Sequence, residues 1–258
     1  MQKKEELMAY QSTPESTPSG IPPVETGVPS TCSLPASSQA NATLSRQFHP
    51  EIYPKEFKLS DIEVPSGDVV YTACPASKRG CPSTTCPGYC KSSIVIAIDG
   101  ARRKYGRRGA QASIGVYHGP NHDWNASALV SPELKQLPQV AVLAACEKAL
   151  LNACTFQNYW GELAGMVEEG TNERLREVVI KTDSEFLVSS VTELIFKWKA
   201  NGWLNAQGLQ VINRDQFLNI ESLIESLENN MVTVRFWHVP RTLNQDADRL
   251  ARSALKYH

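Results

Sequence analysis

The feature that most constrains the fold is a run of five apolar residues, residues 94–98, which ends at Asp99 and Gly100. A strand with one exposed face alternates apolar and polar side chains, whereas this run has no polar position. It therefore predicts a strand that is buried on both faces. Such strands are typical of sheets that carry helices on their faces.

The sequence beyond this run switches between strand and helix patterns. Further strands are predicted at residues 112–117, 124–130, 178–182 and 232–239, and helices at residues 139–154, 183–191, 214–228 and 244–257. Tight connections join the first three strands, which predicts that they pair antiparallel. The predicted fold class is α/β: a five-stranded mixed sheet, three antiparallel strands then two parallel strands, with helices on its faces.

Three segments of the chain differ in composition. Residues 1–45 are rich in Ser, Thr and Pro and poor in large apolar side chains, so we expect a disordered tail that cannot offset its ordering entropy. Residues 46–91 contain aromatic residues and four cysteines, and they are expected to form a loop-rich lead-in to the main domain. Residues 92–258 carry the regular patterns and are predicted to form one domain.

Composition limits the partners and the compartment. The chain has 258 residues and a net charge of -1, so any nucleic-acid binding must depend on a local basic surface. No run of about 18 apolar residues is present, so no membrane partner is expected. The first residues include acids and no apolar signal region, which predicts a cytoplasmic or nuclear protein that is not secreted. Its cysteines are then expected to be reduced.

Three aspartates occupy corresponding places in the predicted layout. Asp99 ends the first strand, Asp183 follows the fourth, and Asp248 lies in the first turns of the last helix. Ligand sites of open α/β sheets gather at strand ends, so these residues are candidates for one catalytic and metal-binding site. Clustered carboxylates repel one another unless a cation neutralises them, and their hard oxygens suit Mg²⁺. Two such ions about 4 Å apart can activate a water and stabilise the leaving oxygen of a phosphodiester.

Each aspartate also has a structural interpretation. Asp99 and Gly100 are compatible with a tight turn, Asp183 with a helix N-cap, and Asp248 with a residue that complements a helix dipole. Taken singly, these interpretations are preferred. The order of the surrounding motifs reverses that preference.

Five motifs in residues 92–258 carry a family resemblance. They are Ile98-Asp99-Gly100-Ala101, residues 112–120, Thr182-Asp183-Ser184, the stretch of residues 198–215 with Asn201-Gly202-Trp203, and Asn244-Gln245-Asp246-Ala247-Asp248. In this order they resemble the type 1 ribonuclease H family, in the form common among fungal and plant RNase H-like proteins. The resemblance implies a ribonuclease H-like fold and an endonuclease that cleaves the RNA strand of RNA–DNA hybrids. It also implies an Asp, Glu, Asp, Asp site with two Mg²⁺ ions, or Mn²⁺ as an alternative.

The fourth carboxylate of that site is missing. The family's glutamate aligns with Val142, and the neighbouring family Arg and Asn align with Val140 and Pro138. A valine cannot bind Mg²⁺ or orient a water. Glu147 lies five residues further on, about 140° around the helix, on its apolar stripe. It either replaces the missing carboxylate through a shifted helix register or sits at the edge of the stripe near solvent or a lysine.

Contacts with nucleic acid are expected from a basic turn beside Asp99. It comprises Arg102, Arg103, Lys104, Arg107 and Arg108. These cations could hold backbone phosphates, or they could form a solvated hairpin tip. The family's Asn in this turn aligns with Tyr105. Gln139 and Trp203 are further candidate contacts, although Trp203 fits core packing at least as well.

Four cysteines are close together in the lead-in. Cys74, Cys81, Cys86 and Cys90 could bind one Zn²⁺, but their spacing lacks the usual pairs with two intervening residues. Free thiols are therefore the favoured interpretation, and zinc is not expected as a cofactor.

Two functions follow from this sequence. The first is a ribonuclease H type 1-like protein that binds RNA–DNA hybrid, or another nucleic-acid duplex, and hydrolyses the RNA strand with two metal ions. The second is a pseudo-nuclease that retains the fold as a nucleic-acid-binding or interaction module, because position 142 is a valine. The identity of this one residue separates the two hypotheses.

Overall fold

The computed structural model describes residues 46–81, 86–103, 109–164 and 174–256. The predicted tail, residues 1–45, lies outside the described residues, as do Lys104, Tyr105, Arg107 and Arg108 of the basic turn. In the described ranges, no helix has both the length and the apolar character needed to cross a membrane.

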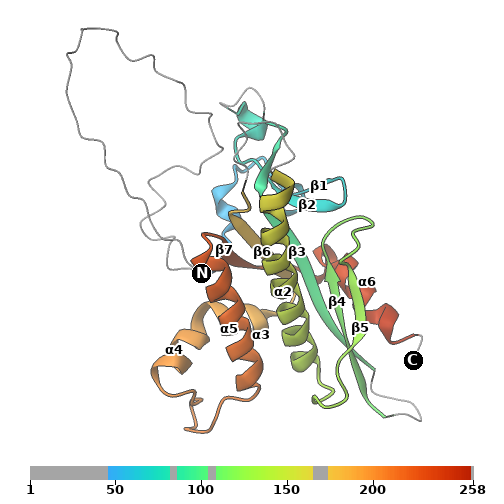
Figure 1. Ribbon diagram of the computed structural model, residues 1–258, viewed down its shortest axis with the longest axis vertical. Coiled ribbons are helices and arrows are strands. Elements are labelled where there is room, and N and C mark those ends of the chain that lie inside the picture. The colour runs from blue at the N-terminus through green and yellow to red at the C-terminus, as the bar shows by residue number, and fades with distance from the viewer. Residues whose placement is uncertain (1–45, 82–85, 104–108, 165–173, 257–258) are drawn as a thin grey trace, which may run out of the picture. The chain divides into compact units, whose positions relative to one another are not determined.

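The five predicted strands belong to one mixed sheet, in which β5 and β7 are edge strands (Figure 1). They are β3 (Tyr89–Arg103), β4 (Gln111–Tyr117), β5 (Ala126–Leu129), β6 (Glu177–Thr182) and β7 (Thr233–His238). Strands β3, β4 and β5 pair antiparallel, whereas β6 pairs parallel with both β3 and β7. The predicted order of three antiparallel and two parallel strands is confirmed.

Strand β3 is buried on both faces, as its apolar run predicts. Ile94, Ile96 and Ile98 belong to the main core, whereas Val95 belongs to a second cluster with Val179. Successive side chains of a strand point to opposite faces, so the even and odd positions pack into different layers. Burying each isoleucine stabilises the fold by roughly 1.5–3 kcal/mol, and a slip of one residue would exchange the two faces.

Helices cover both faces of this sheet (Figure 1). They are α2 (Pro138–Ala164), α3 (Glu185–Ser189), α4 (Ile195–Ala200), α5 (Arg214–Asn229) and α6 (Gln245–Ala254), and a π-helical segment, Ser190–Leu194, joins α3 to α4. Helix α2 packs on β3 and β4 and beside α5, whereas α6 packs on β4, β3 and β5. The predicted helices are present, with the second extended into α4.

Two glycines allow α2 and α6 to approach the sheet closely. A Cβ atom on Gly100 would lie 2.6 Å from the backbone nitrogen of Val142 in α2, and a Cβ on Gly115 would lie 2.1 Å from the carbonyl of Ala247 in α6. Gly115 pairs with Asp99, the neighbour of Gly100, so the two helices lie on opposite faces. Any larger residue at either position would push a helix off the sheet.

The lead-in contains more regular structure than the sequence suggested. Strands β1 (Glu63–Ser66) and β2 (Val69–Ala73) form a hairpin, and β2 pairs antiparallel with the first part of β3. In the ranges that the structure describes, the sheet therefore has seven strands. Gly67, at φ +63°, supplies the left-handed conformation that the two-residue turn between β1 and β2 requires.

The lead-in also builds the second apolar cluster. Phe48, Tyr53 and Ile62 pack there with Trp237 of β7, and the rings of Phe48 and Trp237 are 5.0 Å apart. Val95 and Val179 contribute from the same face of the sheet. The lead-in is thus part of the folded core.

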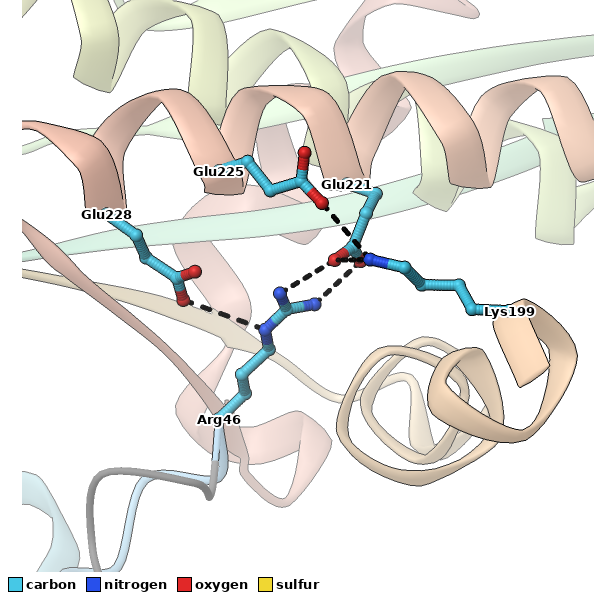
Figure 2. Close-up of polar contacts among 5 residues, drawn as sticks. All are labelled: Arg46, Lys199, Glu221, Glu225 and Glu228. Atoms are coloured by element: carbon cyan, nitrogen blue, oxygen red, sulfur yellow. Dashed lines mark hydrogen bonds and ion pairs between the residues drawn. The ribbon is translucent and has the colours of Figure 1, made fainter.

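Arg46 fastens the start of the described chain to α5 (Figure 2). Its guanidinium donates to both carboxylate oxygens of Glu221 at 2.7 and 2.8 Å, and Lys199 donates to Glu221 at 3.0 Å. Arg46 and Glu221 are both buried. Removing one partner of such a pair typically costs about 3–5 kcal/mol, because the other charge is left buried and uncompensated.

Candidate functional site

Asp99 and Asp183 occupy corresponding positions along two parallel neighbouring strands. Ala97 of β3 pairs with Lys181 of β6, and each aspartate comes two residues after this pair. Asp99 shares the face of its pairing partner Gly115, which is the face that α6 covers. Asp248 lies in the first turn of α6. Sheet register and helix packing therefore bring all three aspartates toward one place.

The structural interpretations of two aspartates are wrong. The predicted strand end at Asp99 and the alternative tight turn are both wrong, because β3 continues through Gly100 to Arg103 in register with β4. Asp183 does not cap the following helix, because the side chain of Ser184 accepts the hydrogen bond from the Leu187 amide at 3.3 Å. The Asp183 carboxylate therefore does not accept the capping hydrogen bond of α3.

Asp99 is buried among like charges. It is 9% exposed, and its carboxylate accepts a hydrogen bond from the Gly100 amide at 2.7 Å. Burial raises the pKa of Asp99 to about 7, and the negative charges of Asp183 and then Asp248 act in the same direction. A cation at this place would relieve that repulsion.

Asp248 differs from Asp99 because arginines already compensate its charge. It forms ion pairs with Arg241 and, at 2.8 Å, with Arg252. Burial acts to raise the pKa of Asp248, but hydrogen bonds from Arg241 and Arg252 outweigh it, and the pKa lies below its ordinary value. A cation bound by Asp248 would have to share this carboxylate with the two arginines.

Asn244 connects the start of α6 with β3 and with the residue that follows β6. Its side-chain nitrogen donates to the Ile98 carbonyl at 3.0 Å and to Asp183 Oδ1 at 2.9 Å. The residue is 1% exposed, and its Oδ1 has no hydrogen-bond partner among the described residues. Asn244 thereby fixes the start of α6 to β3 and holds Asp183. The sequence places it in a motif but gives no sign of this role.

A cleft of about 660 Å³ opens beside Asp248. It is lined by Arg241, Thr242, Gln245, Asp248, Arg249 and Arg252. Three of its six lining residues are arginines, so we name it the basic cleft. The sequence does not point to it, because Arg241 precedes α6 and the other two arginines are three residues apart on the helix. Only the helical period brings them onto one surface.

No carboxylate reaches this site from the first turns of α2. Val142 is buried in the main core, and its backbone nitrogen is the closest approach of α2 to Gly100. Residues 138–146 contain no acid. The position that aligns with the family glutamate thus lies beside Gly100, on the face of the sheet that α2 covers, and carries an apolar side chain.

Glu147 is not brought to the aspartates. Burial raises its pKa, and a hydrogen bond with Asn219 of α5 opposes this. Its Oε1 is buried without a partner in the described ranges. Glu147 is also not among the charges that act most strongly on Asp99. The hydrogen bond with Asn219 shows that the carboxylate faces α5.

The side chains that were predicted to contact nucleic acid lie in different surroundings. Arg103 donates to the Leu255 carbonyl and to Gln111, both at 2.7 Å, so its guanidinium anchors the C-terminal helix. Arg102 is half-buried, and Gln139 is exposed at the start of α2. Trp203 is buried against Trp198, with Arg214 over its ring. Core packing, and not an exposed contact, is therefore the observed role of Trp203.

The cysteines of the lead-in form a compact group. The sulfurs of Cys74, Cys81 and Cys86 all lie within 4.8 Å of one another, and in the described part of the chain this is the group of His, Cys, Asp and Glu side chains that meets this distance. The three aspartates do not meet it. Cys90 is nearby on β3, where burial raises its pKa and the charges of Cys86 and Cys81 add to the effect.

Comparison with known proteins gives one family. The family model described as RNase H matches residues 91–256. Ribonuclease H1 of Homo sapiens is 29% identical over 172 residues, which cover 65% of this chain and 52% of that protein. Ribonuclease H1 of Rattus norvegicus is 26% identical over 207 residues, covering 79% of this chain and 64% of that protein. The chain thus spans between half and two thirds of these relatives.

Two solved structures are similar to part of this chain. A foamy viral protease-reverse transcriptase in complex with RNA/DNA hybrid is 18% identical, with a TM-score of 0.47, over 64% of this chain and 20% of that one. LC11-RNase H1, isolated from compost by a metagenomic approach, is 19% identical, with a TM-score of 0.42, over 64% of this chain and 97% of that one.

Proposed function

The chain belongs to the RNase H family, whose model matches residues 91–256, and on that premise we propose that it binds RNA–DNA hybrid and cleaves the RNA strand. Binding uses the basic cleft, and cleavage uses a divalent cation held by Asp99, Asp183 and Asp248. The chemistry is hydrolysis of a phosphodiester bond.

One observation carries this proposal: the three aspartates converge beside the basic cleft. Asp99 has a pKa of about 7 because it is buried and faces Asp183 and Asp248. Perturbed carboxylates next to a cleft are typical of functional sites. The arginines of the cleft offer the positive charge that phosphates require, which the net charge of the whole chain does not.

The donor set fits Mg²⁺ or Mn²⁺. Three carboxylates offer hard oxygen ligands, and the repulsion at Asp99 would fall when a cation binds. When bound, the metal supplies an activated water and charge stabilisation for the leaving oxygen. The chain's own residues orient the carboxylates. Asn244 fixes Asp183, and Arg241 and Arg252 hold Asp248 at the edge of the cleft.

The arginines of the cleft are proposed to bind the nucleic-acid backbone. Arg249 is 73% exposed along its side chain, and Arg241 is 62% exposed. Both therefore have guanidinium nitrogens available to phosphate oxygens, in addition to their ion pairs with Asp246 and Asp248. Such contacts position a duplex without reading its sequence.

Val142 favours a second candidate function, binding without turnover. In the family resemblance the residue at this position is a glutamate, and the first turns of α2 provide no other acid. The protein would then hold hybrid at the same surface but lack a group to orient the attacking water. Both candidates predict the same binding surface and differ only in the chemical step.

One experiment distinguishes the two candidate functions. The purified chain is incubated with RNA–DNA hybrid that carries labelled RNA, in the presence of Mg²⁺ or Mn²⁺. The Val142→Glu variant is run beside the wild type, with Val191→Ala as a control for disturbance of the main core. RNA cleavage by the wild type supports the first function. Binding without cleavage by the wild type, and cleavage that appears in Val142→Glu, refutes it in favour of the second.

A further inference from the structure

The cysteine group lies at the loop end of the β-hairpin that β2 and β3 form. Strand β2 ends at Ala73 and β3 begins at Tyr89, and the two pair antiparallel with Thr72 opposite Cys90. The Cys74 amide donates to the Gly88 carbonyl at 2.9 Å, which closes the base of the connection. Pairing of the strands therefore brings together cysteines that are up to 16 positions apart in the sequence.

The connection between these strands is poor in side chains that could build an apolar core. Residues 75–88 contain none of the large apolar residues, and the short 3-10 turn Ser77–Arg79 is held by polar contacts, with Lys78 bonded to the Glu56 carbonyl and Arg79 to the Glu56 carboxylate. A connection of this length is uncommon in a compact domain, and a bound metal ion is one way to order it.

The sulfur geometry matches a metal site better than a disulfide. Cys74 Sγ and Cys81 Sγ are 3.7 Å apart, and Cys86 Sγ lies within 4.8 Å of both. Zinc–sulfur bonds of about 2.3 Å in a tetrahedron place neighbouring sulfurs about 3.8 Å apart. A disulfide would need a sulfur–sulfur distance of about 2.05 Å, which is much shorter than the 3.7 Å between Cys74 and Cys81.

Burial protects this group on one side. Cys74 is 1% exposed, and Cys81 and Cys86 are half-buried. Three convergent thiols offer soft donors, which suit Zn²⁺ far better than Mg²⁺. A structural zinc site needs four ligands, and the remaining cysteine of the hairpin is Cys90, close enough for the charges of Cys86 and Cys81 to act on it.

We propose that Cys74, Cys81 and Cys86, joined by Cys90, bind one Zn²⁺ ion that fixes the connection between β2 and β3. The Cys90 side chain turns toward the other three as the metal binds. The four thiols lose their protons, so the site consists of four thiolates and one Zn²⁺. The unusual cysteine spacing follows from the hairpin, which supplies its first and last ligands from paired strands.

Metal analysis of the full-length chain tests this proposal directly. The protein is purified under reducing conditions without chelators, its zinc content is measured, and cobalt is substituted for zinc to reveal thiolate ligands by absorption. The variants are Cys86→Ser, in the connection, and Cys154→Ser, a matched control on α2 outside the group.

We expect one zinc per chain in the wild type and in Cys154→Ser, and loss of zinc and of the cobalt–thiolate absorption in Cys86→Ser. A wild-type chain that holds no zinc and gives no cobalt–thiolate absorption would overturn the proposal, whether or not any variant folds. So would a mass lower by two hydrogens before reduction, which indicates a disulfide. Unchanged cobalt absorption in Cys90→Ser would overturn the assignment of the fourth ligand.

Discussion

Replacing Asp99 by asparagine removes one charge from the aspartate site with little change of shape. The side-chain oxygen of the asparagine can still accept the hydrogen bond from the Gly100 amide, which is 2.7 Å long in the structure. The negative charge that faces Asp183 and Asp248 is lost. Asp99→Asn is therefore expected to stabilise the metal-free protein at neutral pH while abolishing cation-dependent activity.

The magnitude follows from the pKa of Asp99. It lies at about 7 against an ordinary value of 3.8, chiefly because the carboxyl is buried and then because of Asp183. Each pKa unit corresponds to about 1.36 kcal/mol, so ionised Asp99 lowers the free energy of unfolding by about 4 kcal/mol. The folded state holds the proton more tightly than the unfolded state. The destabilisation is therefore absent below the ordinary pKa, grows as the pH rises, and is fully present above about pH 7.

Urea unfolding of the wild type and Asp99→Asn at about pH 5 and about pH 8, without added Mg²⁺ or Mn²⁺, measures this effect. The stability advantage of the variant should grow by about 3 kcal/mol between these pH values, because the wild-type carboxylate ionises within this range. Added Mn²⁺ at the higher pH should then stabilise the wild type but not the variant. Equal pH dependence in the two proteins would refute the argument that burial and the charge of Asp183 raise the pKa of Asp99.

Three further predictions concern the surroundings of the aspartates. Arg249→Ala should weaken hybrid binding and reduce the salt dependence of the affinity by about one phosphate contact, a slope change of about 0.9, in fluorescence anisotropy titrations. Arg79→Ala, an exposed arginine paired with Glu56 in the lead-in, is the control, and equal effects of the two would contradict a role for the basic cleft. Asn244→Asp places an oxygen where nitrogen now donates to Ile98 and Asp183, so it should cost about 2–5 kcal/mol in urea unfolding; unchanged stability would exclude the positioning role. Glu147→Gln should leave any RNA cleavage unchanged and should be more stable than the wild type at neutral pH, because burial raises the pKa of Glu147; loss of cleavage would assign Glu147 to the site.

The fold could be predicted from the sequence where apolar patterning is strong. The run that contains Ile94, Ile96 and Ile98 predicts a doubly buried strand, and the strand and helix order beyond it gives the mixed sheet. The hairpin of β1 and β2 was missed because β1 is short and contains Pro65, which argues against a strand. Gly67 and Asp68 between the two strands are a usable turn signal.

The candidate site could be predicted only in part. Asp99, Asp183 and Asp248 follow from motif order, although only Asp183 comes directly after a strand and β3 continues past Asp99. Arg241, Arg249 and Arg252 could not be found in this way, since no compact basic run contains them. The helical period of α6 places Arg249 and Arg252 on one surface, and Arg241 joins them from the turn before the helix. Arg103 shows the reverse case: it belongs to a basic run, but its guanidinium is engaged by the Leu255 carbonyl and Gln111.

Binding of a divalent cation by the three aspartates is most directly measured by titrating Mn²⁺ into the wild type and Asp183→Asn by calorimetry, with Cys86→Ser as a control for the separate cysteine group. We expect Mn²⁺ binding in the wild type and in Cys86→Ser, and a loss of at least about tenfold in affinity in Asp183→Asn, which corresponds to about 1.4 kcal/mol. Equal Mn²⁺ affinity in Asp183→Asn and the wild type would contradict a metal site at Asp99, Asp183 and Asp248.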